Sequence, residues 1–277
     1  MADAKFYESY SRYLHDEDRY ETWEEAVSRV MNVHRIQYKD KMTPELTELI
    51  DYVQKAYEDK QILAAQRSLQ FGGEQLLKQN SKLYNCTATY VDRVDFFKEG
   101  FFLMLSGCGI GFSVQTHHVA KLPGILPRND GTISFTVEDS IEGWADSIGA
   151  LVESYMQVDS QYFGKKIYFD TTQVRPKGAE ISGGFKAPGP EPLKKALELI
   201  QTRFIAALSK GQRLSTLDIY DITMYIADAV ISGGVRRAAS ICLFSKTDTE
   251  MLNAKTGNWF IDNPQRGRRQ INASMQW

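Results

Sequence analysis

The sequence predicts an α/β protein with a helical region over residues 1–80, followed by a mostly parallel sheet over residues 81–277. Three observations support this fold class. Charged and apolar residues recur at helical spacing in the first region. After Gly72-Gly73 the pattern changes to short runs rich in β-branched and aromatic residues, which alternate with helical segments. This alternation continues to the end of the chain, and strands separated by helices imply right-handed crossovers between parallel strands.

Two segments define the helical region. Glu21 to Val33 carries charged and apolar positions at helical spacing. Thr43-Pro44-Glu45 provides an N-cap, a first-turn proline and an acidic first turn for a helix that runs toward Gln70. We therefore expect residues 1–80 to form a helical unit of their own.

The second region is expected to hold five strands with helices between them. In chain order the strands are 82–91, 109–115, 166–174, 237–245 and 268–276, and the helices are 92–105, 137–156, 191–208 and 217–231. Two stretches rich in proline and glycine, 121–131 and 178–190, are predicted loops. Both follow strands, and ligands of parallel α/β folds gather at the carboxyl ends of strands, so these loops are also candidate ligand contacts.

Composition excludes several classes of protein. The chain has 33 basic and 35 acidic residues, so no global charge would draw it onto nucleic acid or an anionic membrane. The longest apolar stretches, such as residues 101–105, fall far short of the roughly 18 that a membrane-spanning helix needs. The amino terminus lacks the apolar core of a signal peptide, which favours the cytoplasm. Three cysteines without metal-ligand spacing predict free thiols and no zinc site.

Other residues that suggest chemistry have simpler explanations. Adjacent histidines in a strand, such as His117 and His118, would point to opposite faces, so we expect no metal site there. The arginines at positions 266, 268 and 269 form a local charge run of the kind that is usually a solvated face. Cys242, between Ile241 and Leu243, is most simply a core residue.

Three segments carry the informative motifs: Tyr84-Asn85-Cys86-Thr87, Gly107-Cys108-Gly109-Ile110-Gly111 and Ser232-Gly233-Gly234-Val235-Arg236-Arg237. Taken alone, Cys86 could be a buried structural cysteine, the glycines at 107 and 109 a bulge at the start of a strand, and the third segment a helix C-cap with a basic turn. Glycine also permits close approach of the backbone to a ligand, and an arginine offers a planar fork for phosphate.

In this order the three motifs resemble the first half of a ribonucleotide reductase catalytic chain. The resemblance is strongest to the adenosylcobalamin-dependent, thioredoxin-reduced triphosphate reductases. It implies that residues 81–277 form a five-stranded half of a ten-stranded α/β barrel. From the residues alone, a complete small domain with an open sheet remains the alternative.

The resemblance also implies roles for residues. Cys86 matches the first-strand cysteine, one of two thiols that reduce the 2′ position and become a disulfide. Gly107, Cys108 and Gly109 match the segment that contacts the substrate nucleoside, where Cys108 would be a small side chain facing the base or a third redox thiol, and we favour the first. Ser232, Gly233, Gly234 and Arg236 match the specificity loop between an allosteric deoxynucleotide and the substrate, and Arg237 belongs either to this loop or to the strand that follows. The loop at 174–184, rich in basic and glycine residues, resembles an effector-side loop.

What the chain lacks is also informative. The family's radical cysteine, the partner thiol and the finger-loop residues have no counterpart in it. The resemblance therefore implies the amino-terminal piece of a reductase for DNA synthesis, inactive alone. It implies adenosylcobalamin as cofactor, bound mostly outside this chain. The implied partners are a carboxy-terminal half, a thioredoxin-like reductant, a nucleotide substrate and a deoxynucleotide effector.

Two alternatives remain open. A metal-radical diphosphate reductase shares the barrel and the first-strand cysteine. The segments Tyr7 to Tyr13 and Glu21 to Glu25 favour the cobalamin enzymes, because they resemble the helical opening of the monomeric members. A non-enzymatic module that senses deoxynucleotide levels belongs to another class, and it would not need Cys86.

Overall fold

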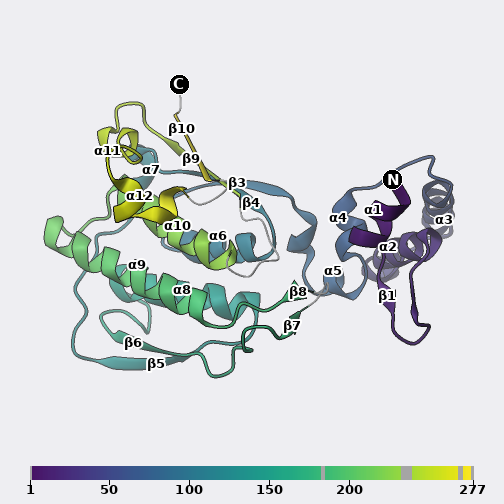
Figure 1. Cartoon of the computed structure of the whole chain (residues 1–277), viewed down its shortest axis with the longest axis horizontal. Coiled ribbons are helices and arrows are strands. Elements are labelled where there is room, and N and C mark those ends of the chain that lie inside the picture. Colours follow the sequence, from purple (N-terminus) through teal and green to yellow (C-terminus); the bar gives the residue numbers. More distant parts are fainter. Residues whose placement is uncertain (1, 182–184, 232–238, 268–270, 276–277) are drawn as a thin grey trace. The chain divides into compact units, whose positions relative to one another are not determined.

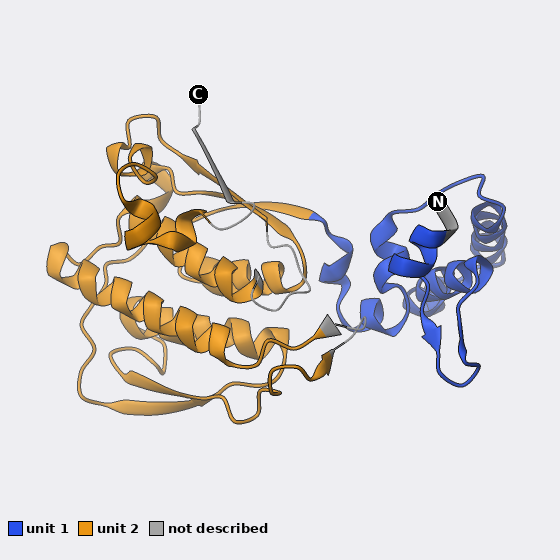
Figure 2. Ribbon diagram, in the orientation of Figure 1, with its two compact units in different colours: residues 1–85 blue, residues 86–277 orange. Residues whose placement is uncertain are grey.

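The structure is a computed structural model that describes residues 2–181, 185–231, 239–267 and 271–275. The chain divides into two compact units, residues 1–85 and 86–277 (Figure 2). The predicted boundary after residue 80 lies within a short 3-10 helix, η2 (Asn80–Leu83), just before this division. Within the described residues, no helix is both long and apolar enough to cross a membrane.

Unit 1 is mainly helical. Its helices are α1 (Ala2–Ser9), α2 (Trp23–Gln37), α3 (Pro44–Glu58), α4 (Gln66–Phe71) and α5 (Glu74–Lys78), with a 3-10 turn η1 (Lys39–Lys41) and a short hairpin of β1 (Tyr13–Leu14) and β2 (Arg19–Tyr20). Thr22 caps α2 and forms a capping box with Glu25. Thr43 caps α3, with Pro44 in the first turn as the sequence predicted.

The core of unit 1 forms where α2 packs on α3. It contains Ala26, Val27, Val30, Met31, Ile50, Tyr57 and Leu69. Beside this core, the guanidinium of Arg29 pairs with the buried carboxylate of Glu21 at 2.8 Å and donates to the carbonyl of Gly72. The buried ion pair thus joins the start of α2 to the end of α4.

Unit 2 is built on a parallel sheet of four strands in the order β10-β9-β4-β3 (Figure 1). Their bounds are β3 (Cys86–Tyr90), β4 (Gly109–Ser113), β9 (Ser240–Phe244) and β10 (Ile271–Met275). Four helices pack in a ring of contacts: α6 (Phe96–Leu105), α8 (Ile141–Met156), α9 (Glu191–Lys210) and α10 (Thr216–Ile231). Of these, α6 contacts β4 and α10 contacts β9, so these two helices cover one face of the sheet.

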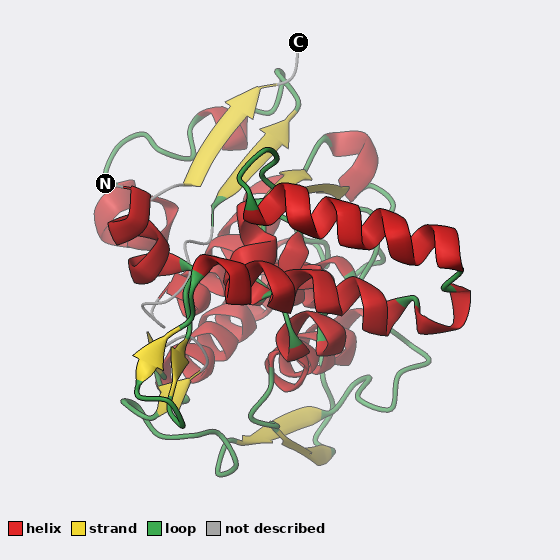
Figure 3. Cartoon of the chain, turned by 90° about the vertical axis from the view of Figure 1, so that its right-hand side faces the viewer, coloured by secondary structure: helices red, strands yellow, loops and turns green. Residues whose placement is uncertain are grey.

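The remaining strands lie apart from this sheet. A strand that the sequence analysis did not predict, β5 (Thr132–Thr136), pairs in parallel with β6 (Lys166–Asp170). Figures 1 and 3 show this pair on the side of the helices away from the main sheet. A two-residue hairpin of β7 (Glu180–Ile181) and β8 (Phe185–Lys186) precedes α9. The expectation of five strands in one sheet is therefore corrected: in the described chain the sheet has four, because the strand at 166 joins β5 instead.

The segment between β9 and β10 contains only short helical elements in its described part. It contains α11 (Thr249–Leu252), α12 (Trp259–Asp262) and a 3-10 turn η3 (Pro264–Gly267). Arg266 of η3 donates two hydrogen bonds of 2.6 Å to the fully buried carboxylate of Asp221 in α10. Arg203 of α9 forms an ion pair with the same carboxylate at 2.9 Å. The prediction that Arg266 lies on a solvated face was wrong, because it closes a buried charge network. Arg268 and Arg269 lie outside the described residues.

Candidate functional site

The two faces of the four-stranded sheet differ in character. On the face covered by α6 and α10, Ile110, Phe112, Cys242 and Phe244 are buried in the core. The opposite face is open. In register along it lie Cys86 beside Gly109, Ala88 beside Gly111 and Ile241, and Tyr90 beside Ser113 and Leu243. Tyr90 is 57% exposed, Ile241 42% and Leu243 36%, so much of this face of unit 2 is accessible, whereas Ser113 at its carboxyl end is buried.

Cys86 stands at the first position of β3, on the open face, and its side chain is exposed. A thiol that exchanges with a disulfide must be reached by its partner, so this placement fits a redox role. The other two cysteines are fully buried. Burial raises the pKa of Cys242, which keeps it a neutral thiol, and its prediction as a core residue is confirmed.

The expectation that Cys108 faces a base is corrected by its burial. Its side chain is 0% exposed. It precedes Gly109 in β4, and side chains alternate along a strand, so Cys108 belongs to the helix-covered side with Ile110. A substrate on the open face would therefore meet Gly109 and Gly111. A Cβ at Gly111 would lie 3.3 Å from Cγ2 of Ile241, closer than side chains ordinarily pack.

Gly107 has a structural task of its own. It adopts φ 90° directly after α6, where its N–H donates to the carbonyl of Met104 and the N–H of Cys108 donates to that of Leu103. These two bonds form a Schellman motif, which ends a helix with a residue in a left-handed conformation. The conformation accounts for glycine at 107, and its predicted contact with substrate stays a prediction.

Gly107→Ala is expected to destabilise unit 2 by roughly 1–2 kcal/mol, because a Cβ is strained at this φ. Urea unfolding measures the change. Gly100→Ala, within α6 itself, is a matched control: its Cβ would meet only Cδ1 of Ile110 at 4.0 Å, and the change should stabilise by up to about 1 kcal/mol. Equal effects of the two substitutions would contradict this account of Gly107.

The predicted specificity loop residues Ser232, Gly233, Gly234 and Arg236, together with Arg237, lie outside the described residues. The described chain brackets them. Helix α10 leads to Ile231, and the carbonyl of Ala239 accepts a 2.8 Å hydrogen bond from the N–H of Ile110. The chain therefore returns to the sheet at the amino ends of β9 and β4, the end at which Cys86 and Gly109 lie.

The loops that the sequence analysis named as candidate ligand contacts, 121–131 and 174–190, offer fewer free polar groups to a ligand than expected. Arg175 is engaged by Asp139, with 2.6 Å between its Nε and the carboxylate. Residues 182–184 lie outside the described part of the chain. The loop at 121–131 instead bonds to its own unit: the N–H of Ile125 donates to the carbonyl of Gln212 in the turn between α9 and α10, and the N–H of Leu126 donates to the carbonyl of Tyr155 in α8.

A second polar cluster, which the sequence analysis did not predict, lies at the carboxyl ends of β3 and β4. His117 and His118 belong to a short helix, α7 (Thr116–Val119), and not to a strand, so their rings lie 3.9 Å apart. Nδ1 of His118 is 2.9 Å from Oγ of Ser113, and its ring packs against Tyr90 at 4.5 Å. Burial lowers the pKa of His118, His117 and Lys121 lower it further, and Asp92 opposes the shift.

The His118 imidazole is expected to titrate below the ordinary value of 6.5, because burial disfavours its charged form. As the pH falls, the imidazole of His118 is protonated in the unfolded chain before it is protonated in the folded chain. The free energy of unfolding therefore decreases as the pH falls through the pKa of His118 in the unfolded chain. NMR titration of the ring protons measures the midpoint, and Asp92→Asn should move it further down. A midpoint at or above 6.5 would contradict the placement of this ring.

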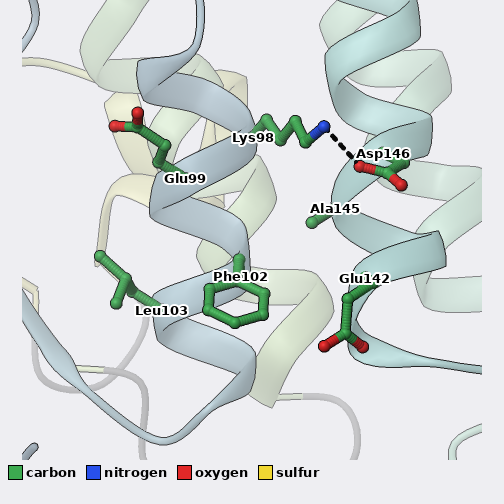
Figure 4. Close-up of a pocket in the computed structure, with 7 residues that line it drawn as sticks. All are labelled: Lys98, Glu99, Phe102, Leu103, Glu142, Ala145 and Asp146. Carbon is green, nitrogen blue, oxygen red and sulfur yellow. Dashed lines mark ion pairs between the residues drawn. The ribbon is translucent and has the colours of Figure 1, made fainter. Parts of the chain in front are cut away.

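A recess of about 460 Å³ lies between α6 and α8 (Figure 4). Phe102, Leu103 and Ala145 line it, together with Lys98, Glu99, Glu142 and Asp146. Nζ of Lys98 pairs with Asp146 at 2.6 Å, and the hydrogen bond to Asp146 raises the pKa of Lys98. The recess contains none of the predicted site residues, and its three carboxylates disfavour a phosphate ligand.

Comparisons with known proteins agree with these features. The profile described as "B12-dependent ribonucleotide reductase, insertion domain" matches residues 115–204. The chain is 26% identical over 314 residues to an adenosylcobalamin-dependent ribonucleoside-triphosphate reductase of Lactobacillus helveticus, covering 89% of this chain and 41% of that protein. It is 25% identical over 284 residues to a putative enzyme of the same name from Mycobacterium phage D29, covering 88% of this chain and 40% of that one.

A solved crystal structure of a B12-dependent (class II) ribonucleotide reductase superposes with a TM-score of 0.80 at 22% identity, over 98% of this chain and 45% of the other. The chain spans about two fifths of the length of the curated relatives it matches. These comparisons do not favour the metal-radical alternative. The resemblance that the motifs predicted is thus confirmed: over nearly its whole length this chain is similar to the amino-terminal portion of adenosylcobalamin-dependent, class II ribonucleotide reductases.

Proposed function

We propose that this chain forms one wall of the active site of an adenosylcobalamin-dependent ribonucleoside-triphosphate reductase, which makes deoxyribonucleoside triphosphates in the cytoplasm for DNA synthesis. The observation that carries the proposal is the exposed thiol of Cys86 on an open sheet face, beside Gly109. Further strands from a carboxy-terminal part would cover this face and complete a ten-stranded barrel. A closed barrel leaves no sheet edge and excludes solvent from the reaction.

The chemistry of ribose reduction determines which reactive groups this chain must provide. Replacing the 2′ hydroxyl by hydrogen takes two electrons and two protons: the hydroxyl leaves as water, and two thiols become a disulfide. Cys86 is one of these thiols. Cys108 and Cys242 are buried, so the second thiol comes from the remainder of the protein. A thioredoxin-like dithiol then restores the pair by exchange, which requires an accessible sulfur.

The glycines beside Cys86 suit the nucleoside. Gly109 and Gly111 present bare backbone on the open face, so a flat sugar and base can approach the strand closely. The residues at 232–236, which follow α10, are proposed to link a deoxynucleotide effector to the choice of base. Their position in the sequence between α10 and β9 supports this assignment.

The described residues do not fit the cofactor. Adenosylcobalamin is larger than the 460 Å³ recess between α6 and α8, and that recess is lined by carboxylates. Within the described chain, no group of three or more His, Cys, Asp or Glu side chains could hold a metal ion. We therefore assign the cofactor site to the remainder of the protein, and this chain to reduction and substrate contact.

Reconstitution tests the proposal. This chain, mixed with the carboxy-terminal portion that completes the reductase, should form deoxynucleotides from ribonucleoside triphosphates with adenosylcobalamin and a dithiol. Neither portion should form deoxynucleotides by itself. An inactive mixture of two folded portions would contradict the proposal, as would turnover by this chain alone. A preference for diphosphates would contradict the substrate assignment only.

A further inference from the structure

Ile241 and Cys86 point to the same face of the main sheet. Residues 240–244 of β9 alternate between buried and exposed positions, and Ile241 is one of the exposed ones, so its side chain points away from α6 and α10. The ladder places Gly111 beside Ile241 and Gly109 beside Cys86. Paired residues of neighbouring strands share a face, so the sheet itself fixes this arrangement, whatever else in the protein lies against it.

Gly111 leaves room for the side chain of Ile241. A Cβ atom at position 111 would lie 3.3 Å from Cγ2 of Ile241 and 3.9 Å from Cβ of Ala88. The second distance is an ordinary contact, whereas the first is closer than side chains ordinarily pack. The Cγ2 methyl of Ile241 therefore takes part of the space that a side chain at position 111 would need. It bounds, on the β9 side, the strip of glycine backbone that begins beside Cys86.

The spacing of the strands suits a nucleoside. Neighbouring strands lie about 4.8 Å apart, so β3 and β9, which flank β4, are separated by about 10 Å. The proposed function places the 2′ position of the ribose at Cys86 and lays the nucleoside over Gly109 and Gly111. A nucleoside in this position extends from β3 toward β9. The side chain that it meets on β9 beside Gly111 is that of Ile241.

The position of Ile241 in the chain indicates which part of the nucleoside it meets. Residues 232–236 are proposed to link a deoxynucleotide effector to the choice of base, and Ile241 follows them closely in the sequence. A segment that responds to the base must lie beside it, so the base is expected on the β9 side. Isoleucine has no hydrogen-bonding group in its side chain, so it contributes packing and the burial of apolar surface.

On the basis of the function proposed above, we propose that Ile241 is a substrate-contact residue whose Cγ2 methyl packs against the nucleobase beside Gly111. Ile241 lies outside the three motifs that predicted the site. Packing of this kind is the same in the bound substrate and in the transition state, so Ile241 sets the affinity for the nucleotide and not the rate of ribose reduction. Cys86 has the opposite role, because its thiol takes part in the chemistry.

Two substitutions test the methyl group in the reconstituted reductase. Valine keeps Cγ2 and lacks Cδ1, whereas leucine has as many carbons as isoleucine but no methyl on Cβ. Ile241→Leu should raise KM for ribonucleoside triphosphates about tenfold, with a smaller rise for Ile241→Val and much less change in kcat for either. Loss of side-chain volume alone gives the opposite order of KM values, and that order would overturn the proposal.

Leu243→Ala is the matched control. Leu243 is exposed on the same face as Ile241 but lies farther along β9. Its substitution should leave KM within about twofold of the value for the parent reductase, because it removes apolar surface that the nucleobase does not reach.

Urea unfolding of this chain alone tests the contact independently of activity. Gly111→Ala is introduced into the parent sequence, into Ile241→Val and into Ile241→Leu. In the first two proteins the new Cβ meets Cγ2 of residue 241, and in the third it does not. Gly111→Ala should therefore shift the unfolding midpoint more favourably in Ile241→Leu than in the other two. Equal shifts in all three proteins would overturn the placement of the methyl group.

The kinetic outcomes distinguish the role of Ile241 from the function of the whole site. If the parent mixture forms deoxynucleotides and Ile241→Leu has the same KM as Leu243→Ala, Ile241 does not contact the substrate, and the proposed function stands. If the parent mixture is inactive although both portions are folded, the proposed function fails, and the role of Ile241 fails with it.

Discussion

Cys86→Ser is expected to reduce deoxynucleotide formation by the completed reductase roughly a thousandfold or more. Serine keeps the size and polarity of the side chain, but it cannot form a disulfide, so the two electrons for the 2′ position are lost. Folding should not change, because Cys86 is exposed at the end of a strand. The measurement is single-turnover formation of deoxynucleotide in the reconstituted mixture.

Thiol titration supplies the control. In the folded chain one of the three cysteines should react readily with an aromatic disulfide reagent, and all three should react in denaturant, because Cys108 and Cys242 are buried. Cys86→Ser should remove the fast-reacting thiol. If this variant loses that thiol and still reduces nucleotides at the full rate, Cys86 has no redox role, and a nucleotide-sensing function gains support.

Local patterns in the sequence were enough to predict the strands at 86, 109 and 240. Each is a short run of β-branched, aromatic or small residues directly after a glycine-containing or helical segment. The cap of α3 followed from Thr43 and Pro44, whose preferences act within one helical turn. The exposure of Cys86 followed from its match to a motif, since its own neighbours could equally surround a buried residue.

Long-range features could not be read from local patterns. Strand β5 was missed because Thr132 to Thr136 is a short run between a loop and a helix, and its partner β6 lies 34 residues further along the chain. Arg266 looked like one of a solvated cluster, because its partner Asp221 lies 45 residues away. The burial of Cys108 depends on the turn that ends α6, and the glycine at 107 was the only local signal of that turn.

Asp221→Ala is expected to lower the free energy of unfolding by about 3–5 kcal/mol, the largest change in stability that we expect for unit 2. Asp221 is fully buried, and Arg266 and Arg203 both pair with it. Its removal leaves the Arg266 guanidinium, whose side chain is 13% exposed, without its carboxylate. Arg203 keeps Asp218 at 3.6 Å and the hydroxyl of Tyr225 at 2.8 Å. Urea unfolding followed by circular dichroism measures the loss.

Two further variants separate the burial of charge from the mere loss of an ion pair. Asp139→Ala removes a pair with Arg175 that is equally short, at 2.6 Å, but partly exposed, so its effect should stay below about 1 kcal/mol. Asp221→Leu combined with Arg266→Met removes both buried charges and should recover much of the stability that Asp221→Ala loses. If Asp221→Ala costs no more than Asp139→Ala, the buried network of α9, α10 and η3 adds no more stability than an exposed ion pair. If the double variant is as unstable as Asp221→Ala, packing and not charge determines the stability of this region.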